Sequence, residues 1–264
     1  MDLTGLAVPV RSKLTAIVLR AVDYGESDRV VTLFTRERGK VSAFARGARS
    51  SRRRFGGGLE PFTLVSAEVR ERPGSDLLGL DTISVRRAFG AIRGDLARIA
   101  CAGYAVELAR ELVRDHEPHD DLYELLGSYL EALDAGPALP ATLRAFELGA
   151  LAAAGLAPRL DGCARCGRPL EPGAPVVRFD PGQGGVLCRA CAPLAGPGWI
   201  DLSAGAHRVL ERLARGGLAA GGEPLAPAEG REARDALTRF VEHHLGRTLH
   251  ARKFLDEVGP ALGV

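Results

Sequence analysis

The chain has 264 residues and is 46% hydrophobic, which is enough to bury a sizeable core and excludes a disordered chain. No run of about 18 apolar residues occurs, and the first residues lack a basic stretch followed by an apolar one, so neither a membrane span nor a signal peptide is predicted. The net charge is only +2. We therefore expect a cytoplasmic protein without a disulfide framework.

The first third of the chain is predicted to form about five short strands, as in a small β-barrel. Runs of β-branched and apolar residues are separated there by turn residues such as Gly, Asp and Ser. The expected strands are residues 14–22, 29–35, 40–46, 62–70 and 77–85.

Positive charge is concentrated between Arg36 and Arg54. This segment holds eight basic residues and one acid, Glu37, a local charge of +7 on a nearly neutral chain. Such a block favours a polyanionic partner at one place on the surface. A solvated basic loop is the alternative interpretation.

The third expected strand carries small apolar residues on one face and Phe44 among cations on the other, because side chains alternate across a strand. A ring among cations is typical of a surface that stacks a base and neutralises phosphates. Packing of Phe44 under a neighbouring loop is the alternative. Phe55, in the basic connection 49–58, is a second candidate for stacking. The predicted nucleic-acid contacts are Lys40, Phe44, Arg46, Arg49, Arg52, Arg53 and Arg54.

From about residue 88 the pattern becomes helical, and we expect amphipathic helices that pack into a bundle. Two helices are expected to close the chain, at about Ser203–Ala214 and Glu229–Leu245, with Gly216–Pro227 as a loop between them. Three histidines near Arg247, Arg252 and Lys253 suggest a second, weaker basic surface there.

Two Cys-x-x-Cys pairs, Cys163 with Cys166 and Cys188 with Cys191, are separated by 21 residues. This spacing predicts one structural zinc ion with four thiolate ligands and no open position. Residues 176–180 and 185–187 are expected to pair as a hairpin between the knuckles, which gives a zinc ribbon. Two disulfides or a redox pair are the alternatives. Cys101 is expected to be a small buried hydrophobic residue.

We find no motif of a catalytic site. The sequence His116-Glu117-Pro118-His119 has the wrong spacing for a zinc protease, and Pro118 would break the helix that such a motif needs. The acids Asp115, Glu117, Asp120 and Asp121 could serve a metal-dependent nuclease, but a solvated helix junction explains them more simply. We therefore expect a protein that is not an enzyme and has no small-molecule substrate.

Several segments, in their order along the chain, resemble the RecO family of bacterial recombination mediators. The segments that carry the resemblance are Ile17–Arg20, Tyr24–Asp28, Leu33–Thr35, Gly39–Val41, Ala45–Arg49, Leu59–Phe62, Tyr104 with Glu107-Leu108, Phe146–Leu148, Gly155–Pro158 and Gly184–Cys188. Two further segments, Leu245–Arg247 and Phe254-Leu255, show a weaker similarity. The family more often has Gln where this chain has Glu60.

The resemblance implies an α+β multidomain chain. An N-terminal OB-fold β-barrel in residues 1–85 would bind DNA, and an α-helical bundle domain in residues 86–264 would carry the inserted four-cysteine zinc ribbon at about 160–193. It also implies a DNA repair and recombination mediator of the RecF pathway that binds single- and double-stranded DNA, anneals complementary strands and helps load RecA.

The partners implied by the resemblance are RecR and the C-terminal tail of single-strand-binding protein, which is acidic and ends in an apolar residue. The implied location is the cytoplasm, at the nucleoid. An RNA-binding protein with an OB-fold and a zinc ribbon is the alternative.

Overall fold

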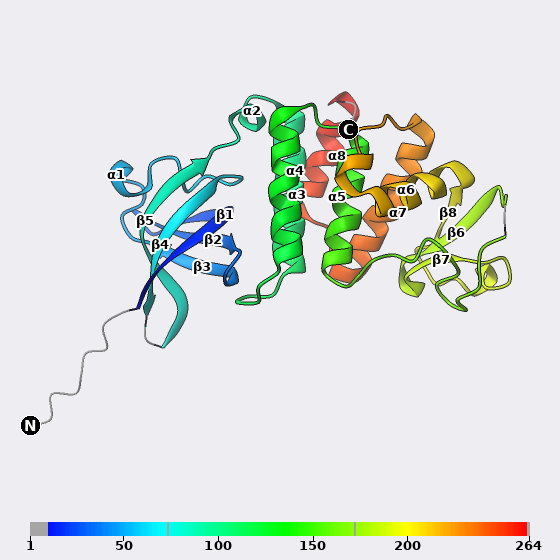
Figure 1. Ribbon diagram of the computed structural model, residues 1–264, viewed down its shortest axis with the longest axis horizontal. Coiled ribbons are helices and arrows are strands. Elements are labelled where there is room, and N and C mark those ends of the chain that lie inside the picture. Colours follow the sequence, from blue (N-terminus) through cyan, green and yellow to red (C-terminus); the bar gives the residue numbers. More distant parts are fainter. Residues whose placement is uncertain (1–9, 73, 172, 263–264) are drawn as a thin grey trace, which may run out of the picture. The chain divides into compact units, whose positions relative to one another are not determined.

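The computed structural model describes residues 10–72, 74–171 and 173–262 (Figure 1). The chain forms two compact units. The first contains the described residues up to Gly90 together with Val113–Tyr123, and the second contains Ala91–Leu112 and the chain from Glu124 onward.

The first unit is built on a closed five-stranded barrel with the strand order β1-β2-β3-β5-β4. Strand β1 (Arg11–Tyr24) pairs through its first half with β4 (Leu64–Arg72) and through its second half with β2 (Asp28–Thr35). An irregularity between Val18 and Arg20 lets β1 bend from one neighbour to the other. Strand β3 (Gly39–Ala45) closes the barrel by pairing in parallel with β5 (Ser75–Arg87). This OB-like barrel confirms the expected fold of the N-terminal region.

The barrel core follows from alternation along the strands. Val41, Ala43 and Ala45 of β3 point inward and are buried, as the sequence predicts, while Lys40, Ser42 and Phe44 lie on the outer face. The inward residues join Val31, Leu33 and other apolar side chains in one core. Burial of this apolar surface stabilises the barrel.

The connection from β3 to β4 differs from the expected irregular loop. It contains a short helix, α1 (Arg52–Phe55), and Phe55 is 1% exposed and packs in the barrel core. The prediction that Phe55 offers a stacking face is therefore wrong. Strand alternation applies only within strands, so it could not indicate which way a residue of this helix points.

The segment Val113–Tyr123 belongs to the barrel unit, although it follows a helix of the other unit, α3 (Leu96–Leu112), and includes the first turn of the next helix, α4 (Asp120–Ala135). Asp115 bridges to Lys40 in parallel, and the His116 backbone N–H donates to the Lys40 carbonyl at 2.8 Å. The Tyr123 ring meets the Phe34 ring edge-on, with centroids 5.5 Å apart. Gly39, at φ +63°, gives the close approach room, because a Cβ there would meet the Glu117 carbonyl oxygen.

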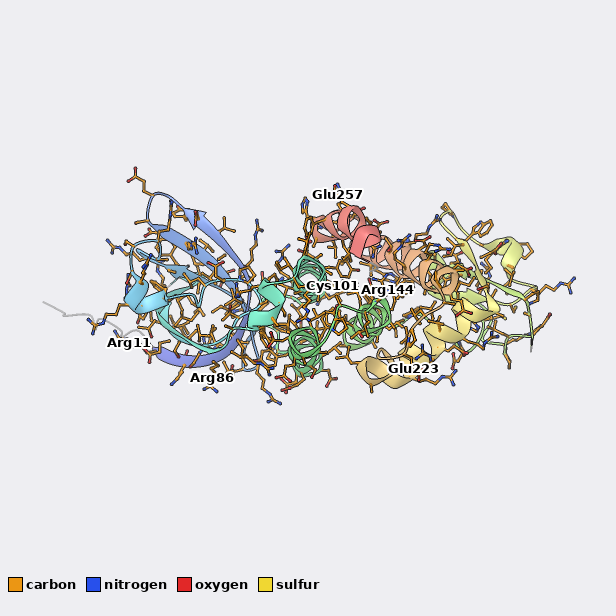
Figure 2. All side chains as sticks on the ribbon, turned by 90° about the horizontal axis from the view of Figure 1, so that it is seen from above. Arg11, Arg86, Cys101, Arg144, Glu223 and Glu257 are labelled. Carbon is orange, nitrogen blue, oxygen red and sulfur yellow. The ribbon has the colours of Figure 1, made fainter. Side chains whose placement is uncertain are left out.

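The second unit is mainly helical, which confirms the expected bundle. Its interior is formed by apolar side chains, and Cys101 and Arg144 both lie inside it (Figure 2). Cys101 is fully buried, as expected. The helices are α2 (Gly90–Arg93), α3 (Leu96–Leu112), α4 (Asp120–Ala135), α5 (Pro140–Ala153), α6 (Ala204–Ala220), α7 (Pro227–Leu245) and α8 (His250–Leu262).

A small three-stranded sheet with the order β7-β6-β8 lies between α5 and α6 in sequence. Strands β6 (Val176–Asp180) and β7 (Gly185–Leu187) form the predicted hairpin, and the 3-10 turn η1 (Pro181–Gln183) connects them. Strand β8 (Ile200–Ser203) adds to β6 and was not predicted. A second 3-10 turn, η2 (Ala192–Leu194), follows the last cysteine.

The end of the chain corrects three predictions. Helix α6 continues to Ala220 across a kink at Gly217, so the expected loop is shorter, and a third helix, α8, follows α7. Arg252 of α8 is only 4% exposed and is ion-paired with Asp256, so it does not belong to a basic surface. Within the described residues, none of the helices is both long and apolar enough to span a bilayer.

Candidate metal centre and nucleic-acid interface

The four cysteines lie on two tight turns beside the β6–β7 hairpin. In the first turn the Cys163 N–H donates to the Arg168 carbonyl at 2.8 Å, and the Gly167 N–H donates to the Cys163 carbonyl at 2.9 Å. In the second, the N–H groups of Cys191 and Ala192 both donate to the Cys188 carbonyl at 2.9 Å. These backbone bonds fix each Cys-x-x-Cys pair as a knuckle whose two thiols face the same point.

The structure brings all four predicted ligands together. Their Sγ atoms lie within 4.8 Å of one another, and Cys166 Sγ is 3.7 Å from Cys188 Sγ. Sulfurs held at about 2.3 Å from one tetrahedral ion would be roughly 3.8 Å apart. All four cysteines are free, and the 3.7 Å separation is far longer than a disulfide bond of about 2.05 Å.

The four thiols influence one another's protonation. Burial raises the pKa of Cys163, but backbone hydrogen bonds from Cys188, Cys166 and Arg165 outweigh it and lower this pKa to about 6. Burial and the three neighbouring thiols raise the pKa of Cys191 to about 12. Each thiolate that forms makes deprotonation of the next thiol harder, because like charges repel. A bound dication offsets this repulsion. The donor set therefore fits zinc, which prefers four such ligands in a structural site.

The basic segment of the first unit is divided between the two ends of β3. At one end, the guanidinium of Arg38 contacts Glu71 at 3.0 Å, and the Lys40 ammonium contacts Asp115 at 3.3 Å. The Lys40 side chain is only 17% exposed. This end of β3 thus has its charge largely paired within the protein.

The arginines at the other end of β3 fall into two groups. Arg46, Arg52 and Arg53 are exposed, and their side chains make no hydrogen bond or ion pair within the part of the chain that the structure describes. These three residues are called the open arginines below. They carry positive charge that a polyanion could reach.

Arg49 and Arg54 instead hold the loop together. Arg49 Nη1 donates to the Glu26 carbonyl at 3.1 Å. Arg54 Nη2 donates to the Arg46 carbonyl at 2.6 Å, and its guanidinium lies 4.8 Å from the centroid of the Phe55 ring. Arg54 therefore fastens α1 beside the end of β3, close to Arg46.

Phe44 lies half-buried on the outer face of the barrel. The exposed Tyr24, at the end of β1, meets its ring at 81° with centroids 5.7 Å apart. The Arg72 guanidinium, at the end of β4, lies 6.0 Å from the Phe44 centroid. Strands 2 and 3 and the loops after strands 1 and 4 form the usual ligand face of an OB-fold, and these three residues lie on that face.

Sequence reasoning missed Tyr24 and Arg72. Tyr24 lies where the sequence predicts a turn, and only the extension of β1 to this residue places it beside β3. Continuing the alternation past Val22 would have placed Val22 and Tyr24 on one face. Arg72 reaches Phe44 through strand pairing across the barrel, for which the sequence carries no local signal.

Two family models match the chain. The model described as "Recombination protein O N terminal" matches residues 10–89, and "Recombination protein O C terminal" matches residues 93–253.

Similar proteins come from several bacteria, and each is named DNA repair protein RecO. One from Anaeromyxobacter dehalogenans (strain 2CP-1 / ATCC BAA-258) is 73% identical over 96% of this chain and 99% of the relative. One from Myxococcus xanthus (strain DK1622) is 49% identical over 92% of this chain and 96% of the relative. One from Geobacter sulfurreducens is 42% identical over 96% and 99%, respectively.

Proposed function

Because this chain belongs to the RecO family of DNA repair proteins, we propose that it acts as a recombination mediator that binds DNA and anneals complementary strands. It would bind both single- and double-stranded DNA and help load RecA onto strands coated with single-strand-binding protein. The observation that carries this proposal is the outer surface of the barrel, where the Phe44 and Tyr24 rings meet and the exposed Arg46 directly follows β3.

Annealing requires no bond chemistry, so a protein without a catalytic site can perform it. Two polyanions must approach each other, and the bases must stay free to pair. Arg46, Arg52 and Arg53 neutralise phosphates and release condensed counterions. Phe44 and Tyr24 offer ring faces on which bases stack without being read for sequence.

The salt dependence of DNA binding tests this assignment. Replacing Arg52 and Arg53 with Ala should lower the slope of log K against log salt for single-stranded DNA by roughly 0.7 per lost phosphate contact. Annealing of complementary strands coated with single-strand-binding protein should slow in parallel. Anisotropy with a labelled oligonucleotide measures the slope.

The matched control is Arg168→Ala with Arg208→Ala, which removes two exposed arginines of the second unit. This variant should keep the wild-type slope. An unchanged slope in the Arg52/Arg53 variant would remove these residues from the DNA interface. Tighter binding of single-stranded RNA than of DNA in direct competition would favour the RNA-binding alternative.

The zinc ion would have a structural role in this function. Cys163, Cys166, Cys188 and Cys191 would hold one Zn²⁺, which supplies cross-linking of the two knuckles and no reaction chemistry. The family resemblance also supports partnership with RecR and a location in the cytoplasm at the nucleoid.

A pocket in the second unit is suited to the tail of single-strand-binding protein. It has a volume of about 530 Å³ and combines an apolar lining with four arginines. The tail is expected to be acidic with an apolar last residue, and such a segment needs both features. The lining residues that matter here are Pro140, Leu225, Leu255, Arg144, Arg231, Arg234 and Arg252.

A further inference from the structure

The pocket of the second unit contains one acidic side chain among its four arginines, Asp256 of α8. Its carboxylate accepts from Arg252 Nε at 3.2 Å and from Arg252 Nη2 at 2.6 Å. The third nitrogen of that guanidinium, Nη1, is buried and has no hydrogen-bond partner within the described residues. The fork of Arg252 that could hold a carboxylate in two bonds is therefore already filled from within the chain.

Asp256 differs in its access to solvent from Glu147, the acid that pairs with the lining residue Arg144 but is not itself part of the lining. The Asp256 side chain is 50% exposed, whereas Glu147, whose Oε2 lies 2.8 Å from Arg144 Nε, is fully buried. Removing one partner of a buried charge is costly, because the other charge is left unpaired. Arg252 is only 4% exposed, so Asp256 can leave it only as another carboxylate takes its place, while the half-exposed carboxylate of Asp256 becomes solvated by water.

We propose that Asp256 is an internal competitor that occupies the carboxylate position of this pocket until an acidic ligand displaces it. The inference rests on the proposed tail-binding role of the pocket and names the residue that sets its affinity. Exchange of one carboxylate for another on Arg252 is nearly neutral in free energy. Selectivity must therefore come from the apolar end of the ligand and from Arg231 and Arg234, which keeps free anions from filling the pocket.

Charge-matched variants of α8 test this role. The probe is a short fluorescein-labelled peptide of aspartates that ends in an apolar residue with a free carboxylate. Asp256→Asn should tighten its binding to the full-length protein about three- to tenfold, because the competing charge is gone. Glu257→Gln makes the same change in net charge one residue further along the helix, at an exposed side chain outside the pocket lining (Figure 2), and should leave the affinity unchanged.

The outcomes separate this inference from the assignment of the pocket. If the wild type binds the peptide and Asp256→Asn binds it equally or more weakly, the competitor role is wrong and the pocket assignment stands. Equal tightening by Glu257→Gln would also overturn it, because general electrostatics would then explain the gain. If neither wild type nor Asp256→Asn binds, both are wrong. Asp256→Ala should repeat the gain, and thermal unfolding of each variant confirms that it is folded.

Discussion

At the scale of single residues, two phenylalanines of the same basic segment have opposite surroundings. Phe44 lies half-buried on the outer face of β3, while Phe55 is 1% exposed inside the barrel. Alternation predicts the first position correctly because Phe44 lies in a strand. It could not predict the second, since the three arginines before Phe55 form a helical turn that directs the ring inward.

Replacing each ring should therefore affect a different property. Phe55→Ala removes a core side chain and should cost about 3–5 kcal/mol of unfolding free energy. Phe44→Ala should change stability little but weaken single-stranded DNA binding by about 1–3 kcal/mol, because a stacking face is lost. Denaturant unfolding and fluorescence anisotropy measure the two effects. If Phe55→Ala keeps the wild-type stability, Phe55 is not a core residue. If Phe44→Ala keeps the wild-type affinity for single-stranded DNA, Phe44 is not a stacking residue.

Ion pairs between residues far apart in the chain also cannot be predicted from the sequence. The pattern groups Lys40 with the other cations of its segment, yet the structure pairs it with Asp115, far along the chain. The same limit applies to Arg252, which looks exposed in sequence and is buried against Asp256. Local composition gives the amount of positive charge in a segment. Tertiary contacts determine how much of that charge is paired within the protein and how much is available to a ligand.

At the scale of elements, the ribbon hairpin is predicted from sequence and the third strand of its sheet is not. The hairpin has a turn signal, and Asp180 completes it by accepting from the N–H groups of Gly182, Gln183 and Gly196. Helix α8 is also missed from the sequence, because the group that caps its first turn belongs to another helix. Glu107 of α3 accepts from the N–H groups of His250 and Ala251 and so caps α8 from another element.

Removing the metal should loosen this element before it affects DNA binding. Chelation of zinc should lower the midpoint of thermal unfolding, since metal binding free energy is folding free energy for such a site. DNA affinity should persist at temperatures where the protein is still folded, because the open arginines and Phe44 belong to the other unit.

Matched cysteine variants extend this test. Cys166→Ser should abolish the single zinc equivalent, whereas Cys101→Ala, a buried cysteine outside the cluster, should retain it. Measurement of metal content and melting curves on the same samples separates the two. Loss of DNA affinity ahead of stability would contradict a structural role.

At the scale of the whole molecule, the sequence predicts the order of architectures along the chain but not its complete path. The change from period-two to helical patterning indicates a barrel followed by helices. Nothing in that pattern indicates that Val113–Tyr123 returns to the barrel unit after α3. Its attachment depends on a backbone bond to Lys40 and on the Tyr123–Phe34 ring contact, which only the folded chain creates.

This return has a consequence for dissecting the protein. A fragment of residues 10–90 would contain every barrel strand but lack the segment that covers Gly39 and Phe34, so it should melt well below a barrel that has the segment. A synthetic peptide of residues 113–123 should restore part of the loss by binding in trans, with a gain that rises with the logarithm of peptide concentration. If the peptide does not change the melting temperature of the fragment, the segment does not stabilise the barrel. The barrel domain is thus encoded by two separate stretches of the gene, and a single cut cannot isolate it intact.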